Sequence, residues 1–140
     1  MSDQRFVTAP RSRYSPAQIR LRLALYLDGL GREAEAIPVY EEALSLGLKG
    51  MDLRDAFVCL ASSLRNVGKS HKAVRHLESA RMKFPGDAVV NLFLALALYD
   101  VKQYKKAIQI LGFALLDEIR GSNVERYRKV LRSRYKYLKG

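Results

Sequence analysis

The stretch RDAFVCLASSLRNVGKSHKAVRHLESARMKFPGD, residues 54–87, is the unit from which the chain is built. A shift of 34 residues toward the C-terminus, or of 37 toward the N-terminus, aligns it with a similar segment. Four positions hold small or apolar residues in all three copies: Ala24, Ala61 and Ala95; Ala36, Ala73 and Ala107; Tyr40, Leu77 and Leu111; and Ala43, Ala80 and Ala114. A fixed period of this size predicts a solenoid, in which each repeat packs against its neighbours.

Two apolar stripes with helical spacing lie in the quoted stretch. The first consists of Phe57, Leu60, Ala61 and Leu64, and the second of Ala73, Val74, Leu77 and Ala80. Gly68 lies between them, where a left-handed residue ends a helix well. Pro85 follows the second stripe, and the residue before a proline is disfavoured in a helix. Each copy is therefore predicted to be two helices joined by a short turn, with small residues that let the helices approach closely.

The same pattern predicts the organisation of the whole chain. Residues 1–14 show no periodicity and are predicted to form a mobile arm. Three repeat units follow, at about 16–47, 53–85 and 87–118. Residues 119–140 are predicted to form a further helix that caps the last repeat and covers Leu111 and Leu115.

Several residues mark where individual helices begin and which way they face. Ser15, Pro16 and Gln18 have the pattern of a capping box. Asp52 and Asp87 are the predicted N-caps of the third and fifth helices. The residues of the first helix that are predicted to face inward are Ile19, Leu23, Ala24 and Leu27. Pro38 lies inside the second predicted helix, where we expect a bend.

The order of these features resembles the bacterial group-five tetratricopeptide domain. The segments that carry the resemblance are GREAEAIPVYEEALSLGL at 31–48, FPGD at 84–87 and FLALALYD at 93–100. The resemblance covers residues 17–138 and implies an all-α, right-handed solenoid of three antiparallel helix pairs with a C-terminal capping helix. It also implies a non-enzymatic adaptor that binds other proteins, so we expect no catalytic residues and no cofactor.

By the family pattern, one side of the first helix of each pair lines a concave groove. The predicted groove residues are Leu21, Leu25, Val58, Ser62, Arg65, Leu92, Phe93, Leu96 and Tyr99. Leu21 and Leu25 stand where carboxylate-binding family members need Lys and Asn, so a C-terminal carboxylate is not the expected ligand. Exposed apolar strips of this kind mark interaction sites. We expect the strip to be covered by an apolar or amphipathic segment of another protein, by a second copy of the chain in a homodimer, or by the chain's own N-terminal arm.

The C-terminal segment carries more than half of the net charge of +11, with eight Lys and Arg residues against a single Glu in residues 119–140. Its predicted apolar face consists of Val124, Tyr127, Leu131 and Leu138, with Tyr135 beside it. The basic residues around that face include Arg126, Arg128, Lys129, Arg132, Arg134 and Lys136. Interleaved Arg and Tyr suit phosphate contacts and base stacking. No recognised nucleic-acid motif accompanies the charge, so capping is the first hypothesis and binding of nucleic acid or another polyanion is the alternative.

Residues with catalytic or metal-binding chemistry are sparse. His71 and His76 are five apart, hence not on one helix face, and no Cys or carboxylate pattern for zinc accompanies them. Cys59, the single cysteine, has no histidine one helical turn away, which a nucleophile would need. Asp28 and Asp100 end equivalent helices and are predicted to be solvated carboxylates. Because the chain shows neither a secretory signal nor an apolar run that spans a bilayer, we expect a cytoplasmic protein without membrane contact.

Overall fold

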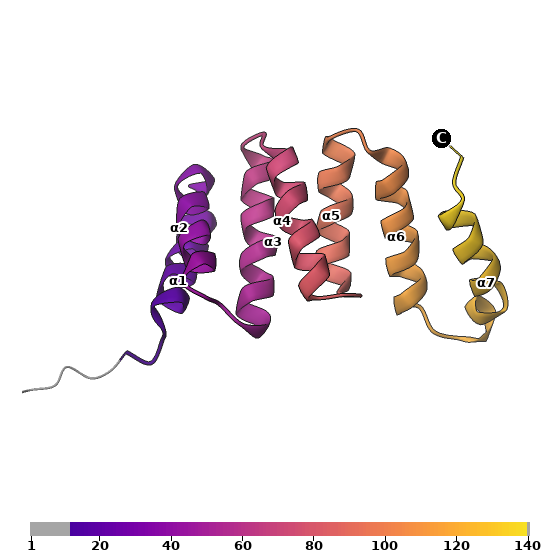
Figure 1. The fold of residues 1–140 in the computed structure, drawn as a ribbon, viewed down its shortest axis with the longest axis horizontal. Helices are drawn as coiled ribbons and strands as arrows, with labels where there is room; N and C mark the ends of the chain where they lie inside the picture. The colour runs from indigo at the N-terminus through magenta and orange to yellow at the C-terminus, as the bar shows by residue number, and fades with distance from the viewer. Residues whose placement is uncertain (1–11, 140) are drawn as a thin grey trace, which may run out of the picture.

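The structure of the chain is a computed structural model that describes residues 12–139. Within that range seven helices follow one another and no strand is present (Figure 1). Their bounds are Pro16–Gly29 (α1), Glu33–Ser45 (α2), Gly50–Asn66 (α3), Ser70–Lys83 (α4), Ala88–Asp100 (α5), Tyr104–Glu118 (α6) and Ser122–Lys136 (α7). The predicted all-α fold class is confirmed.

Helices that are adjacent in the sequence are also neighbours in space. α1 packs on α2, α3 on α4 and α5 on α6, while α2 contacts α3 and α4 contacts α5. The first helices of successive pairs also touch, α1 with α3 and α3 with α5. The array is elongated, with α1 and α2 at one end and α7 at the other (Figure 1). Such an arrangement, in which each pair contacts only the next, is a helical solenoid.

Small residues occupy the points where the helices pack most closely. Ala24, Ala61 and Ala95 are almost fully buried in the first helix of each pair. The second helices bury further alanines at their own repeated positions: Ala36, Ala43, Ala73, Ala80, Ala107 and Ala114. A one-carbon side chain lets two backbones approach, and the larger side chains of Tyr40 and Leu60 fill the space beside the contact.

Two of the predicted helix starts have the expected side-chain caps. The Ser15 backbone N–H donates to Gln18 Oε1 over 3.0 Å, and the Gln18 N–H donates to Ser15 Oγ over 3.2 Å. Asp87 Oδ1 accepts from the Val90 N–H over 3.0 Å. The predicted cap at Asp52 is wrong, because α3 begins at Gly50 and Asp52 instead accepts from Gln18 Nε2 over 2.9 Å. α2 continues through Pro38.

The prediction that Ile19 and Leu23 face inward is wrong, whereas Ala24 is buried and Leu27 is half-buried. Leu23 is 39% exposed, although Leu60 and Leu94, at the same position of the later copies, are fully buried. The later residues are covered by the preceding helix pair, and no pair precedes α1 among the described residues. Exposure at this position is therefore set by the neighbouring repeat and not by the local pattern.

The N-terminal arm predicted over residues 1–14 lies mostly outside the described residues. Within the described part, Arg22 donates to the Tyr14 hydroxyl over 2.8 Å and its guanidinium lies 3.9 Å from the centre of the Tyr14 ring. None of the helices between residues 12 and 139 is both long enough and apolar enough to cross a membrane.

The turn inside each helix pair has the same geometry in all three copies. Gly31 and Gly68 are left-handed, with φ of 72° and 80°. The backbone N–H of the next residue donates a hydrogen bond to the carbonyl five positions earlier. These bonds join Arg32 N–H to Leu27 O over 3.0 Å and Lys69 N–H to Leu64 O over 2.7 Å. Lys102 occupies the third turn with φ of 63°, and Gln103 N–H bonds to Leu98 O over 2.9 Å in the same way. These are the hydrogen bonds of a Schellman motif, which glycine favours because it has no Cβ.

We predict that Lys102→Gly stabilises the chain. A non-glycine residue pays roughly 1–2 kcal/mol in the left-handed region, and glycine returns part of that through the entropy of the unfolded chain, so the net gain should be about 1 kcal/mol. For a chain of this size that is a rise of roughly 2–5 °C in the midpoint of thermal unfolding, measured by circular dichroism. Gly68→Ala, where an added Cβ meets open space, is the matched control and should lower the midpoint. A lower midpoint for Lys102→Gly would contradict the role of backbone strain in this turn.

Candidate protein-binding site

The predicted groove residues fall into two groups. Leu25 of α1 and Leu92, Leu96 and Tyr99 of α5 are exposed, Tyr99 by 64%. Leu21 and Val58 are buried, contrary to the expectation that they form part of an exposed strip. Ser62, Arg65 and Phe93 are half-buried, and Phe93 packs against the core. α3 contacts both α1 and α5, so side chains near these contacts are covered.

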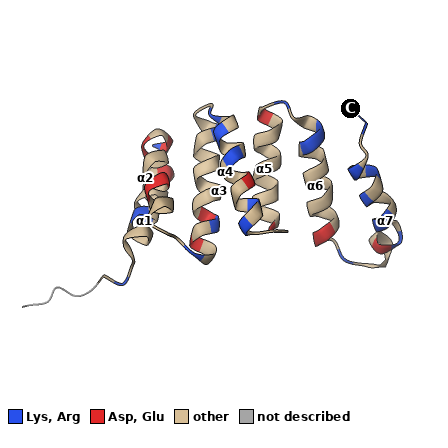
Figure 2. Ribbon diagram, viewed as in Figure 1, with Lys and Arg blue, Asp and Glu red and all other residues tan. Residues whose placement is uncertain are grey.

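The exposed apolar residues of α5 form a strip on one side of that helix. Leu92, Leu96 and Tyr99 are spaced four and three residues apart, which brings them onto one face, and we call them the α5 strip. Asp100 is the one charged residue within α5, and it lies at the C-terminal end of the helix (Figure 2). The strip is therefore an apolar surface with almost no charge along its length.

A cavity of about 480 Å³ lies beside this strip, between α5 and α6. It is lined by Ala95, Leu96, Tyr99, Tyr104, Ala107, Ile108 and Leu111. The rings of Tyr99 and Tyr104 lie 5.2 Å apart, centre to centre. Sequence reasoning missed Tyr104 and Ile108, because the family pattern places groove residues on the first helix of each pair only. For Ile108 the signal was the repeat itself, since its equivalents Val74 and Ile37 are also apolar, whereas Tyr104 is equivalent to Ser70 and has no such signal.

The carboxylates at the ends of α1 and α5 are engaged in contacts within the chain. Asp28 accepts from the Tyr40 hydroxyl over 3.0 Å and from Ser63 Oγ over 3.1 Å. Asp100 accepts from Arg65 Nε over 2.5 Å and from Ser70 Oγ over 3.2 Å. The bond from Arg65 holds the pKa of Asp100 below its ordinary value. The prediction that both are simple solvated carboxylates is wrong, because each joins one helix pair to another helix.

The histidines and the cysteine do not gather into a reactive group. His71 is exposed, whereas His76 is half-buried, lies 6.3 Å from Phe57 between ring centres, and has a pKa lowered by burial. Burial likewise raises the pKa of the Cys59 thiol, which disfavours the nucleophilic thiolate. Among residues 12–139, no three His, Cys, Asp or Glu side chains lie close enough to hold a metal ion.

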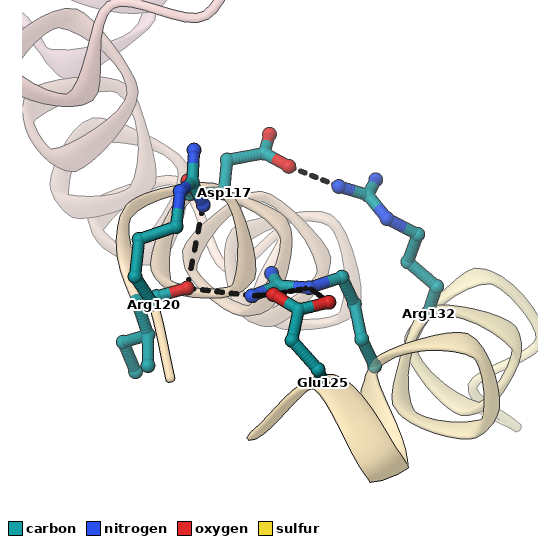
Figure 3. A network of polar contacts seen from close by, with 6 residues as sticks. Asp117, Arg120, Glu125 and Arg132 are labelled. Atoms are coloured by element: carbon teal, nitrogen blue, oxygen red, sulfur yellow. Dashed lines mark hydrogen bonds and ion pairs between the residues drawn. The ribbon is translucent and has the colours of Figure 1, made fainter. Parts of the chain in front are cut away.

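Two of the arginines of the basic helix α7 form ion pairs within the chain, close to the end of α6 (Figure 3). Arg132 pairs with Asp117, and Arg120 donates to the Asp117 carbonyl. Arg128 pairs with Glu125 over 2.6 Å and donates to the Ile119 carbonyl over 2.6 Å. The other members of the predicted polyanion patch are exposed: Arg126, Lys129, Arg134 and Lys136. Two of the six predicted residues are thus already neutralised within the chain.

Tyr135 is one of the residues that attach α7 to α6. Tyr135 covers Gly112, where an added Cβ would overlap its ring, and its ring centre lies 6.4 Å from that of Phe113. Gln109 Nε2 donates to the carbonyls of Tyr135 and Lys136, over 3.0 and 3.1 Å. The least exposed residues of α7 are Val124, Arg128 and Tyr135, so the predicted apolar face is wrong at Tyr127 and Leu131, which are both exposed.

The predicted cover over Leu111 and Leu115 is not present. These residues are 41% and 58% exposed. α7 contacts α6 on the side of Gln109 and Gly112, and it makes no contact with α5. A helix that continued the solenoid would contact both, as α3 and α5 do with the pair before them.

A comparison with curated proteins found no match. A comparison with family models found one, described as a tetratrico peptide repeat, over residues 17–137. Tetratricopeptide repeats are typically non-catalytic modules through which proteins bind one another. The matched range includes nearly all of the described helices, from α1 into α7.

We predict that Gly112→Ala detaches α7 from α6, because the added methyl group and the Tyr135 ring would need the same space. Limited proteolysis should then cleave the segment between α6 and α7 faster than in the unchanged chain. Gly29→Ala is the matched control, since Gly29 is also helical and its added Cβ meets nothing. Equal cleavage rates for Gly112→Ala and the unchanged chain would show that Tyr135 does not hold the helix.

The repeated alanine positions, the shared turn geometry, the stacked helices and the family match agree, and the chain belongs to the tetratricopeptide repeat family, in its group-five branch.

Proposed function

We propose that the chain is a non-catalytic adaptor that binds an apolar or amphipathic segment of another protein along the α5 strip. The observation that carries this proposal is the exposure of Leu92, Leu96 and Tyr99 on one uncharged face, next to the open cavity between α5 and α6. Contiguous apolar surface of this kind is costly to leave in water and marks interaction sites.

The charges near the strip favour an apolar ligand over a charged one. Arg65 and Asp100 neighbour Tyr99 in the groove pattern, and they already pair with each other. The positions that bind a terminal carboxylate in related proteins hold Leu21 and Leu25 here. A ligand that offered a free carboxylate would therefore meet no unpaired cation among these residues, whereas apolar side chains would meet the strip.

The area available is enough for binding of moderate strength. Full burial of a leucine or tyrosine side chain stabilises by roughly 1.5–3 kcal/mol. The burial of three or four such side chains therefore stabilises a complex by more than the lower estimates of the free-energy cost of association, about 4 kcal/mol, but by less than the higher estimates. We therefore expect a reversible interaction, in which a second copy of the chain or the N-terminal arm can compete for the same strip.

Polyanion binding by α7 is the weaker alternative. Arg126, Lys129, Arg134 and Lys136 are exposed, but Arg128 and Arg132 pair with acidic residues. Nucleic acid would have to compete for those two, and four exposed charges on one short helix give weak, salt-sensitive binding without sequence preference.

We predict that Leu25→Glu combined with Leu92→Glu abolishes capture of a partner from a lysate of the source cells. Both side chains are exposed, so the fold should survive, while a partner's apolar residues would have to desolvate two carboxylates. Met82→Glu is the matched control, because Met82 lies on α4 and is 86% exposed. If the doubly substituted chain captures the same proteins as the control does, binding along these first helices is excluded.

A further inference from the structure

The two inner junctions of the solenoid show which positions one helix pair presents to the next. At the first junction, Ile37 and Tyr40 of α2 are buried where α2 meets α3. At the second, Val74 and Leu77 of α4, at the same repeat positions, are buried where α4 meets α5. These positions therefore form the surface on which the first helix of the following pair packs.

The third pair presents the same surface with no helix packed on it among the described residues. Ile108 and Leu111 of α6 occupy these repeat positions, and they are 49% and 41% exposed. They belong to a row at helical spacing that we call the C-terminal face, made of Tyr104, Ile108, Leu111 and Leu115. All four are exposed, and the first three line the cavity between α5 and α6. α7 packs on another side of α6, and only the segment after it comes near this face, where Leu138 and Lys139 line a second cavity together with Tyr104 and Ile108.

The opposite end of the array has the complementary gap. Ile19, Leu23 and Tyr26 of α1 are exposed, together with Leu30 just beyond its end, and we call these four the N-terminal face. Their equivalents in α3 include Ala56, Leu60 and Ser63, and those in α5 include Val90, Leu94 and Ala97. These six equivalents are fully buried, at the junctions with the preceding pairs, whereas Val67, the equivalent of Leu30, is exposed. The N-terminal face is thus the half of a junction that packs onto a preceding pair.

We propose that the N-terminal face of one copy packs on the C-terminal face of another, so that copies of this chain associate end to end and continue the solenoid. This proposal goes beyond the adaptor function, because it uses the two ends of the array and not the α5 strip alone. The two faces differ, so each contact leaves a free face at both ends of the complex. Association should therefore extend past the dimer as concentration rises.

The end-to-end junction would differ from the inner ones in size and in charge. Ile19 and Tyr26 are larger than the Ala and Ser residues at the same positions of α3, and the cavity beside α6 offers room for them. Each inner junction also has an ion pair between second helices, Glu41 with Lys72 and Glu78 with Lys106. The residues at the corresponding positions of the two ends are Gly112, which Tyr135 of α7 covers, and Glu35, so this ion pair has no counterpart in the end-to-end contact. The contact would be apolar, so it should respond little to salt.

The test uses the full chain with one substitution at each end. Leu23→Glu removes the N-terminal face and Leu111→Glu removes the C-terminal face, and both side chains are more than a third exposed. Mass in solution is measured by sedimentation equilibrium over a range of concentrations. We expect the unchanged chain to exceed the mass of a dimer, each variant to remain a monomer, and an equimolar mixture of the two to form a dimer and nothing larger. The mixture retains one intact face on each partner, which is enough for a single contact.

Several results would overturn the proposal. The unchanged chain could remain a monomer up to its solubility limit, or the mixture could remain monomeric. One variant alone could still associate, which would indicate a symmetric contact between identical faces. Leu25→Glu with Leu92→Glu should leave self-association intact, and Leu23→Glu, which lies outside the α5 strip and the cavity beside it, should still capture a partner, so the two proposals fail separately. If circular dichroism shows that an end variant is unfolded, Ile19→Glu and Ile108→Glu replace the pair.

Discussion

The fold depends on the close packing of helices at small residues, which each pair completes only when a neighbour is present. Ala61 and Ala73 let α3 and α4 approach, but Val74 and Leu77 on the far side of α4 are buried only because α5 packs there. One pair alone would expose that surface to water, at about 25 cal/mol for each Å². Stability in such an array is therefore a property of junctions as much as of helices, and the ends of the array are where that requirement is left unmet.

Polar contacts between successive helix pairs fix the orientation of one pair relative to the next. Asp28 bonds to Ser63, Gln18 bonds to Asp52, and Arg65 bonds to Asp100, and each of these contacts joins α1 to α3 or α3 to α5. Apolar contacts tolerate small rotations of one pair against the next, whereas a hydrogen bond constrains both distance and angle. These contacts lie along the first helices, and the one between Arg65 and Asp100 is next to Tyr99 of the α5 strip, so it also fixes the surface on which a ligand would lie.

The sequence predicted what depends on a residue's immediate neighbours and failed where exposure depends on another repeat. The capping box at Ser15, the cap at Asp87 and the turn at Gly68 were predicted correctly, because each involves residues a few positions apart. Leu21 and Leu23 show the limit: the first was expected in the groove and is buried, and the second was expected in the core and is exposed. Periodicity assigns residues to one face of a helix, but whether that face is buried depends on the tertiary packing of another helix against it. The role of the groove residues in binding stays a prediction.

The α5 strip and the two end faces are compatible because they are made of different residues. Leu92 lies on the α5 strip and does not line the cavity between α5 and α6. Leu96 and Tyr99 lie on the α5 strip and also line that cavity. A copy packed on the C-terminal face would cover part of the cavity and bring its own Leu25 into register with the α5 strip of its neighbour, since α1 and α5 are equivalent helices of the repeat. The apolar strips of successive copies would then join into one longer groove. A partner long enough to span two copies would bind both at once, and the second contact would form at the high effective concentration that linked sites provide. Association of the ends would thereby strengthen binding along the groove without any new residue in the groove itself.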